Sequence, residues 1–149
     1  MKEISGHCLC GAVRFEADGP PLFSAHCHCE WCRRAHGAAF VTWLGLREAS
    51  FTIIAGESSL RWYASSEQSR RAFCTTCGTT LLFASSLAPG EMHVALACVD
   101  QPEKHPPTVH VFWDAHVSWS GVADELPKIG RDHPGLQKYG VISPRPASR

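Results

Sequence analysis

The sequence has no excess of charge of one sign and no long apolar run. Its 14 Lys and Arg residues equal its 14 Asp and Glu residues, so no net field would attract nucleic acid or an anionic lipid surface. No apolar stretch approaches the ~20 residues that span a bilayer, and the first seven residues lack the apolar core of a secretion signal. These absences predict a cytoplasmic protein that uses neither nucleic acid nor a membrane as a partner.

Several common functional motifs are also missing. We find no Ser-His-Asp arrangement, no phosphate-binding glycine loop and no dinucleotide fingerprint. What the sequence does contain is eight cysteines, and in a reducing compartment cysteines favour metal ligation over disulfides. Seven of the eight fall into three clusters, namely Cys8 with Cys10, then Cys27 with Cys29 and Cys32, then Cys74 with Cys77. The cysteines therefore carry most of the functional information.

The pattern of short alternating segments separated by Gly and Pro predicts a mostly β fold. A chain of 149 residues suits a single domain, which we expect over residues 1–142, with a flexible C-terminal tail over 143–149. A short helix is expected over Glu30–His36, with Gly37 as its C-cap. The expected strands are Ala12–Ala17, Ala39–Leu46, Phe51–Ala55, Leu60–Ala64, Ala72–Phe73, Thr79–Ala84, His93–Val99 and Val109–Trp113.

The two outer cysteine pairs have the spacing of a closed zinc site. Residues two apart in an extended segment point to the same face, so Cys8 and Cys10 can chelate one ion. Cys74 and Cys77 form a knuckle in which two intervening residues let the chain turn back on the metal. Each pair supplies half of a tetrahedron, so together they predict a structural zinc site that ties the N-terminal strand to a distant hairpin.

The middle cluster predicts a different kind of site. Cys27, Cys29 and Cys32 supply three ligands from one segment, which leaves a fourth zinc position vacant or filled by water. Alternatively, Cys98 or His28 completes a second inert site, or no metal binds there. Cys98 lies alone in an apolar run, where a buried cysteine usually behaves as a small hydrophobic residue.

Several neighbours of the middle cluster are candidates for roles in chemistry. Arg33 and Arg34 could balance the net charge of a three-thiolate zinc site or bind an anionic substrate, although a solvent-facing role also fits. His36 and His28 are candidate proton carriers. Alternatively, His36 is an exposed residue without a role before the glycine that ends the helix, and His28 packs beside the metal ligands. The aromatic residues expected either in the core or in the wall of a cleft beside the second metal are Trp31, Phe40 and Trp43.

The ordered motifs resemble those of the glutathione-dependent formaldehyde-activating enzyme (GFA) family, which includes centromere protein V-like proteins. They run from Gly6 to Phe15, from Cys27 to Gly37 and from Phe73 to Thr79, with a further similar stretch from Val109 to Pro127. The chain resembles the shorter branch of this family. The resemblance implies a small Mss4-like (β-tent) zinc fold with one or two short helical turns. It also implies two Zn²⁺ ions, a structural one at Cys8, Cys10, Cys74 and Cys77 and a catalytic one at Cys27, Cys29 and Cys32.

The activity implied by the resemblance joins formaldehyde and glutathione into S-(hydroxymethyl)glutathione, formally a carbon–sulfur lyase reaction in reverse. We therefore expect a zinc-dependent carbon–sulfur lyase whose partner is a small thiol or thiol adduct such as that of glutathione. The alternative is a non-catalytic zinc-binding domain that serves as a protein interaction module. The fourth ligand of the second metal distinguishes these two functions.

Overall fold

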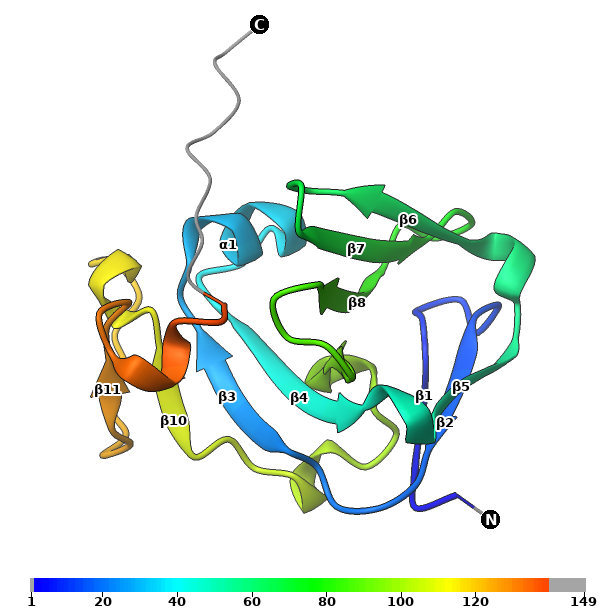
Figure 1. The fold of residues 1–149 in the computed structure, drawn as a ribbon, viewed down its shortest axis with the longest axis horizontal. Coiled ribbons are helices and arrows are strands. Elements are labelled where there is room, and N and C mark those ends of the chain that lie inside the picture. Colours follow the sequence, from blue (N-terminus) through cyan, green and yellow to red (C-terminus); the bar gives the residue numbers. More distant parts are fainter. Residues whose placement is uncertain (1, 140–149) are drawn as a thin grey trace, which may run out of the picture.

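Two β-sheets and a short helix make up the computed structural model, which describes residues 2–139 (Figure 1). The smaller sheet has three antiparallel strands in the order β1-β2-β5. Its strands are β1 (Ile4–His7), β2 (Arg14–Ala17) and β5 (Phe51–Ala55). In β2, Phe15 and Ala17 are buried whereas Arg14 is exposed, which is the alternation expected of a strand with one face on a core.

The larger sheet has eight strands in the order β11-β10-β3-β4-β9-β8-β7-β6. The pairs β3–β10 and β10–β11 are parallel, so a late segment of the chain lies beside β3, at the opposite end of Figure 1 from the smaller sheet. The strands are β3 (Phe23–Cys27), β4 (Val41–Arg47), β6 (Leu60–Ala64), β7 (Ser69–Cys74), β8 (Thr80–Ser85), β9 (Glu91–Ala95), β10 (Val109–Val111) and β11 (Lys128–Ile129).

The helix α1 (Glu30–His36) has a defined cap at each end. The Sγ atom of Cys29 accepts a hydrogen bond from the backbone N–H of Cys32, and Gly37 ends the helix in the left-handed conformation with φ 60°. This confirms the helix predicted over these residues. Six 3-10 segments are described besides it, namely η1 (Glu48–Ser50), η2 (Glu57–Ser59), η3 (Leu96–Cys98), η4 (Pro102–Lys104), η5 (Trp113–Ala115) and η6 (Pro134–Leu136).

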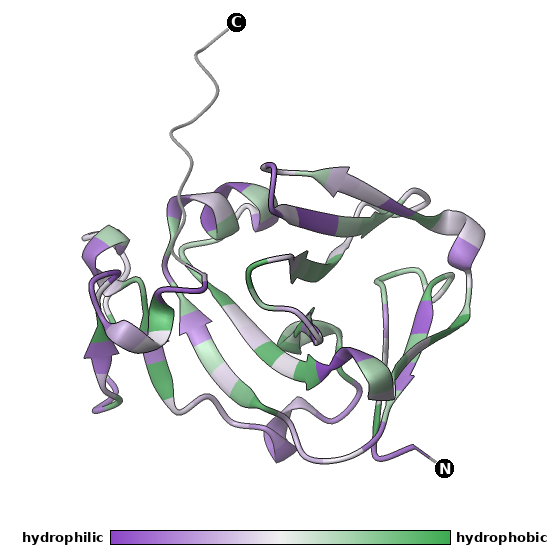
Figure 2. Ribbon diagram, in the orientation of Figure 1, coloured by the Kyte–Doolittle hydropathy of each residue, from purple (hydrophilic) through white to green (hydrophobic). Residues whose placement is uncertain are grey.

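The buried apolar side chains form two clusters. One lies where the two sheets meet and includes Phe15, Leu44 and Leu82. The other lies at the β3–β10 side and includes Trp43 and Phe112. Figure 2 shows the corresponding apolar segments on the strands β3, β4 and β10. Because the second cluster also contains Cys27 and Cys32, the middle cysteine cluster is built into this part of the core.

The mostly β, Mss4-like fold expected from the sequence is confirmed, with differences in detail. Segments β1, β3 and β11 are strands that the sequence pattern did not predict. The strand expected over His93–Val99 ends at Ala95 and continues as η3. The strand expected to reach Trp113 ends at Val111, and η5 begins at Trp113. The tail expected over 143–149, and the end of the expected domain at residue 142, lie outside the described residues.

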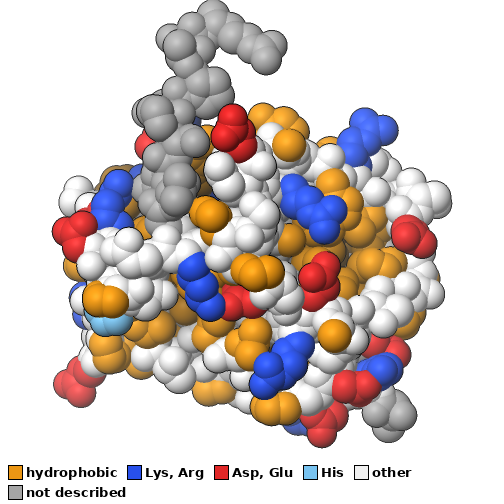
Figure 3. All heavy atoms as spheres, in the orientation of Figure 1, with side chains coloured by type: hydrophobic (Ala, Val, Ile, Leu, Met, Phe, Trp, Pro, Cys, Tyr) orange, Lys and Arg blue, Asp and Glu red, His pale blue; other side chains and the backbone are white. Residues whose placement is uncertain are grey.

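The sequence predicts that neither a membrane nor a nucleic acid is a partner, and the described part of the chain bears on both expectations. None of its helices has the length and apolar character needed to cross a membrane. On the face drawn in Figure 3, Lys and Arg side chains are interspersed with Asp and Glu. That face therefore presents no extended region of one charge.

Candidate metal centres and the adjoining cavity

The first thiol group consists of Cys8, Cys10, Cys74 and Cys77, whose Sγ atoms all lie within 4.8 Å of one another. The Sγ atom of Cys10 lies 3.6 Å from that of Cys8 and 3.9 Å from that of Cys74. The first pair follows β1, whereas Cys74 ends β7 and Cys77 lies in the turn between β7 and β8. The structure thus brings together the four cysteines that the sequence paired, and they could hold a metal ion.

Backbone geometry supports the negative charge of these sulfur atoms. Gly11 and Gly78 follow the two pairs with φ 76° and φ 78°, a conformation that glycine adopts without strain. The N–H of Val13 donates to the Sγ of Cys8 at 3.3 Å. Hydrogen bonds from the side chain and backbone of Thr79 lower the pKa of Cys77 to about 5. The turns therefore favour the thiolate form of Cys8 and Cys77. At Cys10, a backbone hydrogen bond from Ala12 lowers the pKa, but burial and the neighbouring thiols outweigh it and raise the pKa to about 11.

The second thiol group consists of Cys27, Cys29 and Cys32, again with all Sγ atoms within 4.8 Å of one another. Cys27 ends β3, Cys29 is the N-cap of α1, and Cys32 lies in the first turn of that helix. No fourth His, Cys, Asp or Glu within residues 2–139 joins this group. Cys98, which the sequence left open as a fourth ligand, is partly buried and packs against both apolar clusters instead.

Cys32 accepts hydrogen bonds from two side chains that lie far from it in the sequence. Trp43 Nε1 donates to its Sγ at 3.4 Å, and both Nη atoms of Arg71 lie 3.7 Å from the same sulfur. Hydrogen bonds within the thiol group, from Cys27 and Cys29, act with Arg71 and Trp43 to hold the pKa of Cys32 well below its usual value. A buried thiolate at this position is therefore stabilised by the protein itself.

The second thiol group opens into a cavity of about 360 Å³, a volume in the range of small-molecule sites. All three cysteines contribute to its wall, together with Arg71 and His93. Trp31 and Trp43 also line it, as the cleft interpretation of these aromatic residues required. Phe40 does not; its ring packs against those of His26 and His28, with centroids 4.9 and 5.0 Å apart.

The two arginines expected to contact a ligand lie away from this cavity. Arg33 donates from Nε to the carbonyl of His28 at 3.2 Å and from Nη2 to that of Ala115 at 3.3 Å. Arg34 pairs with Glu30 at 3.0 Å, and its side chain is 64% exposed. Neither lines the cavity, whereas Arg71 does. Sequence spacing gave no signal for Arg71, because it lies 39 residues after Cys32 and the sheet alone brings the two together.

His28 is buried in a chain of polar contacts outside the cavity wall. Its Nε2 lies 2.8 Å from Nδ1 of His110, whose Nε2 lies 3.0 Å from both carboxylate oxygens of Asp124. Burial and the neighbouring His110 lower the pKa of His28 to about 4. His26 joins His110 and Asp124 in a third group of nitrogen and oxygen atoms that could hold a metal. However, the rings of His26 and His110 are stacked at 30°, so their in-plane lone pairs do not converge on one point.

His36, the other candidate proton carrier, is also absent from the cavity wall. Its ring packs edge-on against Trp43 with centroids 5.1 Å apart, and its Nε2 is buried without a hydrogen-bond partner among the described residues. Burial lowers the pKa of His36 to about 4. His36 is therefore neutral near pH 7. The roles predicted for His28 and His36 stay predictions.

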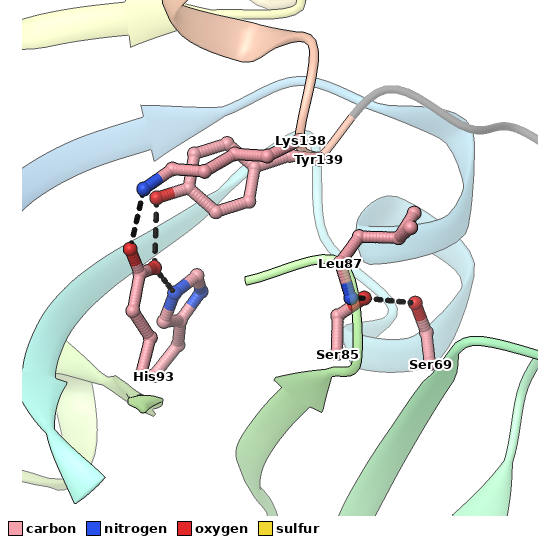
Figure 4. A network of polar contacts seen from close by, with 7 residues as sticks. Ser69, Ser85, Leu87, His93, Lys138 and Tyr139 are labelled. Carbon is pink, nitrogen blue, oxygen red and sulfur yellow. Dashed lines mark hydrogen bonds and ion pairs between the residues drawn. The ribbon is translucent and has the colours of Figure 1, made fainter. Parts of the chain in front are cut away.

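A histidine that the sequence interpretation did not select does line the cavity. The Nε2 of His93 lies 2.8 Å from Oε2 of Glu91, which also accepts from the hydroxyl of Tyr139 at 2.8 Å (Figure 4). Lys138 donates to Oε1 of the same carboxylate at 2.6 Å. Burial raises the pKa of Glu91, but hydrogen bonds from His93, Lys138 and Tyr139 outweigh burial and lower it to about 2. The Glu91 carboxylate thus orients His93 and holds residues 138–139 in the wall of the cavity.

Comparisons with known proteins agree with this arrangement. The family described as glutathione-dependent formaldehyde-activating enzyme matches residues 3–115, a range that includes both thiol groups. An uncharacterized lyase of Schizosaccharomyces pombe is 37% identical over 86 residues, which are 56% of this chain and 59% of that protein. The chain therefore spans less than two thirds of that relative's length.

Two further proteins are similar over longer stretches of one chain or both. A Halomonas elongata protein named "putative glutathione-dependent formaldehyde-activating enzyme" is 25% identical over 123 residues, 78% of each chain. A crystal structure of a Rhodobacter sphaeroides protein superposes with a TM-score of 0.55 and 28% identity, covering 64% of this chain and 87% of the other. The family match extends over most of the 149 residues. The chain belongs to the glutathione-dependent formaldehyde-activating enzyme family.

Proposed function

We propose that the protein holds two Zn²⁺ ions with different roles. The first thiol group offers four sulfur ligands, which is the closed shell of a structural zinc site. The second offers three, with donors from Trp43 and Arg71 that favour the thiolate state of Cys32. Both donor sets suit zinc, which prefers cysteine sulfur in tetrahedral sites.

The function that the geometry supports best is that of a carbon–sulfur lyase acting on a thiol adduct. The observation that carries this proposal is the position of the three-cysteine group in the wall of a cavity. A zinc ion with three protein ligands keeps one position at which the negative charge of a substrate sulfur is stabilised. Membership of the family supports the same chemistry, because the two compounds in its name are glutathione and formaldehyde. Their adduct is S-(hydroxymethyl)glutathione.

The reaction needs no oxidant or reductant. In the adduct RS–CH(OH)R′ the carbon–sulfur bond breaks and sulfur keeps the electron pair. The hydroxyl group loses its proton as the carbonyl forms, and the sulfur gains a proton on release as RSH, so the products are a thiol and an aldehyde. Formation of the adduct is the reverse of these events.

We assign the proton transfer to His93. Glu91 holds its Nε2, so the proton on that nitrogen is fixed and Nδ1 is left as the basic atom. His93 lines the cavity that the thiol group opens into, whereas His28 and His36 do not. Arg71 holds positive charge beside the thiolates, where the net charge of a three-thiolate zinc site is −1.

The test is the rate of aldehyde release from a thiol adduct by the zinc-loaded protein. We expect acceleration for wild-type protein, loss of it in Cys32→Ser, and a strong reduction in His93→Gln with metal content unchanged. The matched control is His105→Gln, which alters a histidine outside the cavity wall. If the zinc-loaded protein neither binds thiols nor changes the rate of adduct formation or breakdown, the proposal is wrong.

The fourth ligand of the second zinc separates this function from that of an interaction module. X-ray absorption spectroscopy averages over both zinc ions, so the zinc-loaded protein should report about 3.5 sulfurs per zinc, the mean of a four-sulfur site and a site with three sulfurs and one light atom. Addition of a thiol should raise this mean to four. An unchanging fourth ligand supplied by a protein side chain would instead support a closed, non-catalytic site.

A further inference from the structure

The cavity beside the second thiol group is walled mainly by aromatic and aliphatic side chains. They come from β3, β4, β8, β10, β11 and the segment around η6, so the apolar surface surrounds the cavity rather than covering one side of it. The side chains that form this surface include Phe23, Trp43, Phe83, Val111, Ile129 and Leu136. Such walls stabilise apolar groups by removing them from water.

The charged groups in this wall already have partners. Lys138 pairs with Glu91 at 2.6 Å, and His93 contacts the same carboxylate at 2.8 Å. Arg71 is buried, directs both Nη atoms to Cys32, and lies over the ring of Phe83 with 4.9 Å between its Cζ and the ring centroid. Among the described lining residues there is therefore no uncommitted Lys or Arg facing the cavity.

Glutathione is poorly matched to such a wall. It carries two carboxylates and one ammonium group, and each needs a charged or hydrogen-bonding partner if it leaves water. The wall offers few such partners, and the lining residues that supply them besides Arg71 and His93 are Ser65, Ser66, Ser69, His133, Lys138 and Tyr139. Recruitment of Arg71 by glutathione would leave the buried Cys32 thiolate without its cation. An uncharged thiol makes no such demand.

We infer that the substrate of this site is an adduct of an aldehyde with an apolar, uncharged thiol of the aryl or branched-alkyl class. This inference rests on the proposed function and names its substrate class. The sulfur lies at the group formed by Cys27, Cys29 and Cys32, and the hydrocarbon part fills the space between Trp43, Phe83 and Leu136. His93 faces the adduct hydroxyl, as in the reaction described above.

The first experiment compares two thiols on the zinc-loaded wild-type protein. Phenylmethanethiol and glutathione are titrated separately to obtain Kd, and the hydroxymethyl adduct of each is assayed for formaldehyde release. We expect phenylmethanethiol to bind about tenfold more tightly, because burial of its ring gains apolar contact that glutathione lacks. We also expect its adduct to have the higher kcat/KM.

A pair of variants tests the cause of the preference. Ile129→Arg introduces a cation into the cavity wall and should lower the ratio of phenylmethanethiol affinity to glutathione affinity by about tenfold. Ile54→Arg is the matched control, because Ile54 lies on β5, is 51% exposed and is outside the cavity. This control should leave the ratio unchanged. Equal ratios in both variants and the wild type would contradict the assignment of specificity to the wall.

The outcomes separate the two proposals. Tighter binding and faster breakdown of the apolar adduct support both. Faster breakdown of the glutathione adduct, with tighter glutathione binding, overturns the substrate class while the lyase function stands. If neither adduct is broken down faster than in buffer, the lyase function fails. In that case the Kd values still test which thiol the cavity prefers. Equal or tighter binding of glutathione overturns the proposed apolar class, and tighter binding of phenylmethanethiol supports it.

Discussion

Arg71 is a buried cation whose only sulfur partner, Cys32, comes from a different element of the fold. Its neighbour Arg70 points to the opposite face of β7, where it is exposed and its Cζ lies 4.2 Å from the ring centroid of Trp62. The alternation of a strand thus separates two chemically identical side chains. One serves the second thiol group, and the other covers an aromatic ring on the surface.

This pair provides a matched test of how the second thiol group is supported. Arg71→Met should weaken zinc binding at that group by about 10- to 100-fold, which is typical when an outer partner of a metal ligand is lost. Arg70→Met should leave zinc affinity unchanged. Competition with a chromophoric chelator measures both affinities. Equal losses in the two variants would mean that Arg71 does not act through Cys32.

The depressed pKa of His36 predicts a pH dependence of stability. In the unfolded chain His36 binds a proton near its ordinary pKa of 6.5, whereas burial delays protonation of the folded protein to about pH 4. The unfolded state therefore binds more protons between these values, so this contribution to stability is complete above pH 6.5 and is lost as pH falls toward 4.

A variant that cannot titrate isolates this contribution. His36→Phe should gain stability relative to the wild type as pH falls from 6.5 to 4, by on the order of 1–3 kcal/mol. Chemical denaturation at several pH values, with both proteins zinc-loaded, gives the difference in free energy of unfolding. A difference that does not change with pH would show that His36 is protonated equally in both states.

The helix α1 is a short element that contains Cys32 and has Cys29 as its N-cap, so two of the three cysteines of the second group depend on it. Its seven residues are too few for an independently stable helix, so its caps and its packing must hold it. Cys29 caps the N-terminus through its sulfur, and Gly37 ends the helix with φ 60°. The hydroxyl of Thr80 donates to the carbonyl of Ala35 at 3.1 Å and ties the last turn to β8.

The contribution of the C-cap glycine to stability can be tested by the addition of one methyl group. Gly37→Ala should cost about 1 kcal/mol, because a Cβ is unfavourable in the left-handed conformation. Among residues 2–139, no heavy atom beyond the adjoining residues and the backbone of the helix lies within 4 Å of that Cβ, so steric contact adds nothing. Gly121→Ala is the control, since it has the same open surroundings and no positive φ. Thermal unfolding should show a lower Tm for the first variant alone.

Across the whole molecule the two thiol groups differ in what they connect. The first joins the segment after β1 to the turn between β7 and β8, and so links the two sheets through residues about 65 positions apart in the sequence. The second lies at the end of one strand and the start of the adjacent helix. Loss of the first metal should therefore affect the fold, and loss of the second should affect the cavity.

Serine substitutions in each group should separate these effects. Structural zinc contributes an apparent ~10–16 kcal/mol, which is comparable to the ~5–15 kcal/mol stability of a whole domain. Cys77→Ser should therefore unfold the protein, whereas Cys32→Ser should remain folded with one zinc. Circular dichroism and metal content measured on both variants test this. Equal collapse of both variants would mean that both metals are structural.

The success of prediction from the sequence differs from element to element. The helix over 30–36 was predicted correctly, because its capping residues are local. The strand β3, which positions Cys27, was missed although Phe23–Cys27 does alternate apolar and polar residues, because five residues make only a short pattern. The strand β11 has two residues, too few for any periodic pattern to show.

The sequence by itself determined the grouping of the seven clustered cysteines and the mostly β character of the chain. Ligands that lie two or three residues apart act as local chelates, so spacing alone indicates which sulfurs can meet. The tertiary structure decided what surrounds the second group. Trp43, Arg71, His93 and Tyr139 come together only when β4, β7, β9 and the segment after η6 pack around one cavity. No local pattern encodes that meeting, because the contacts depend on sheet order and register.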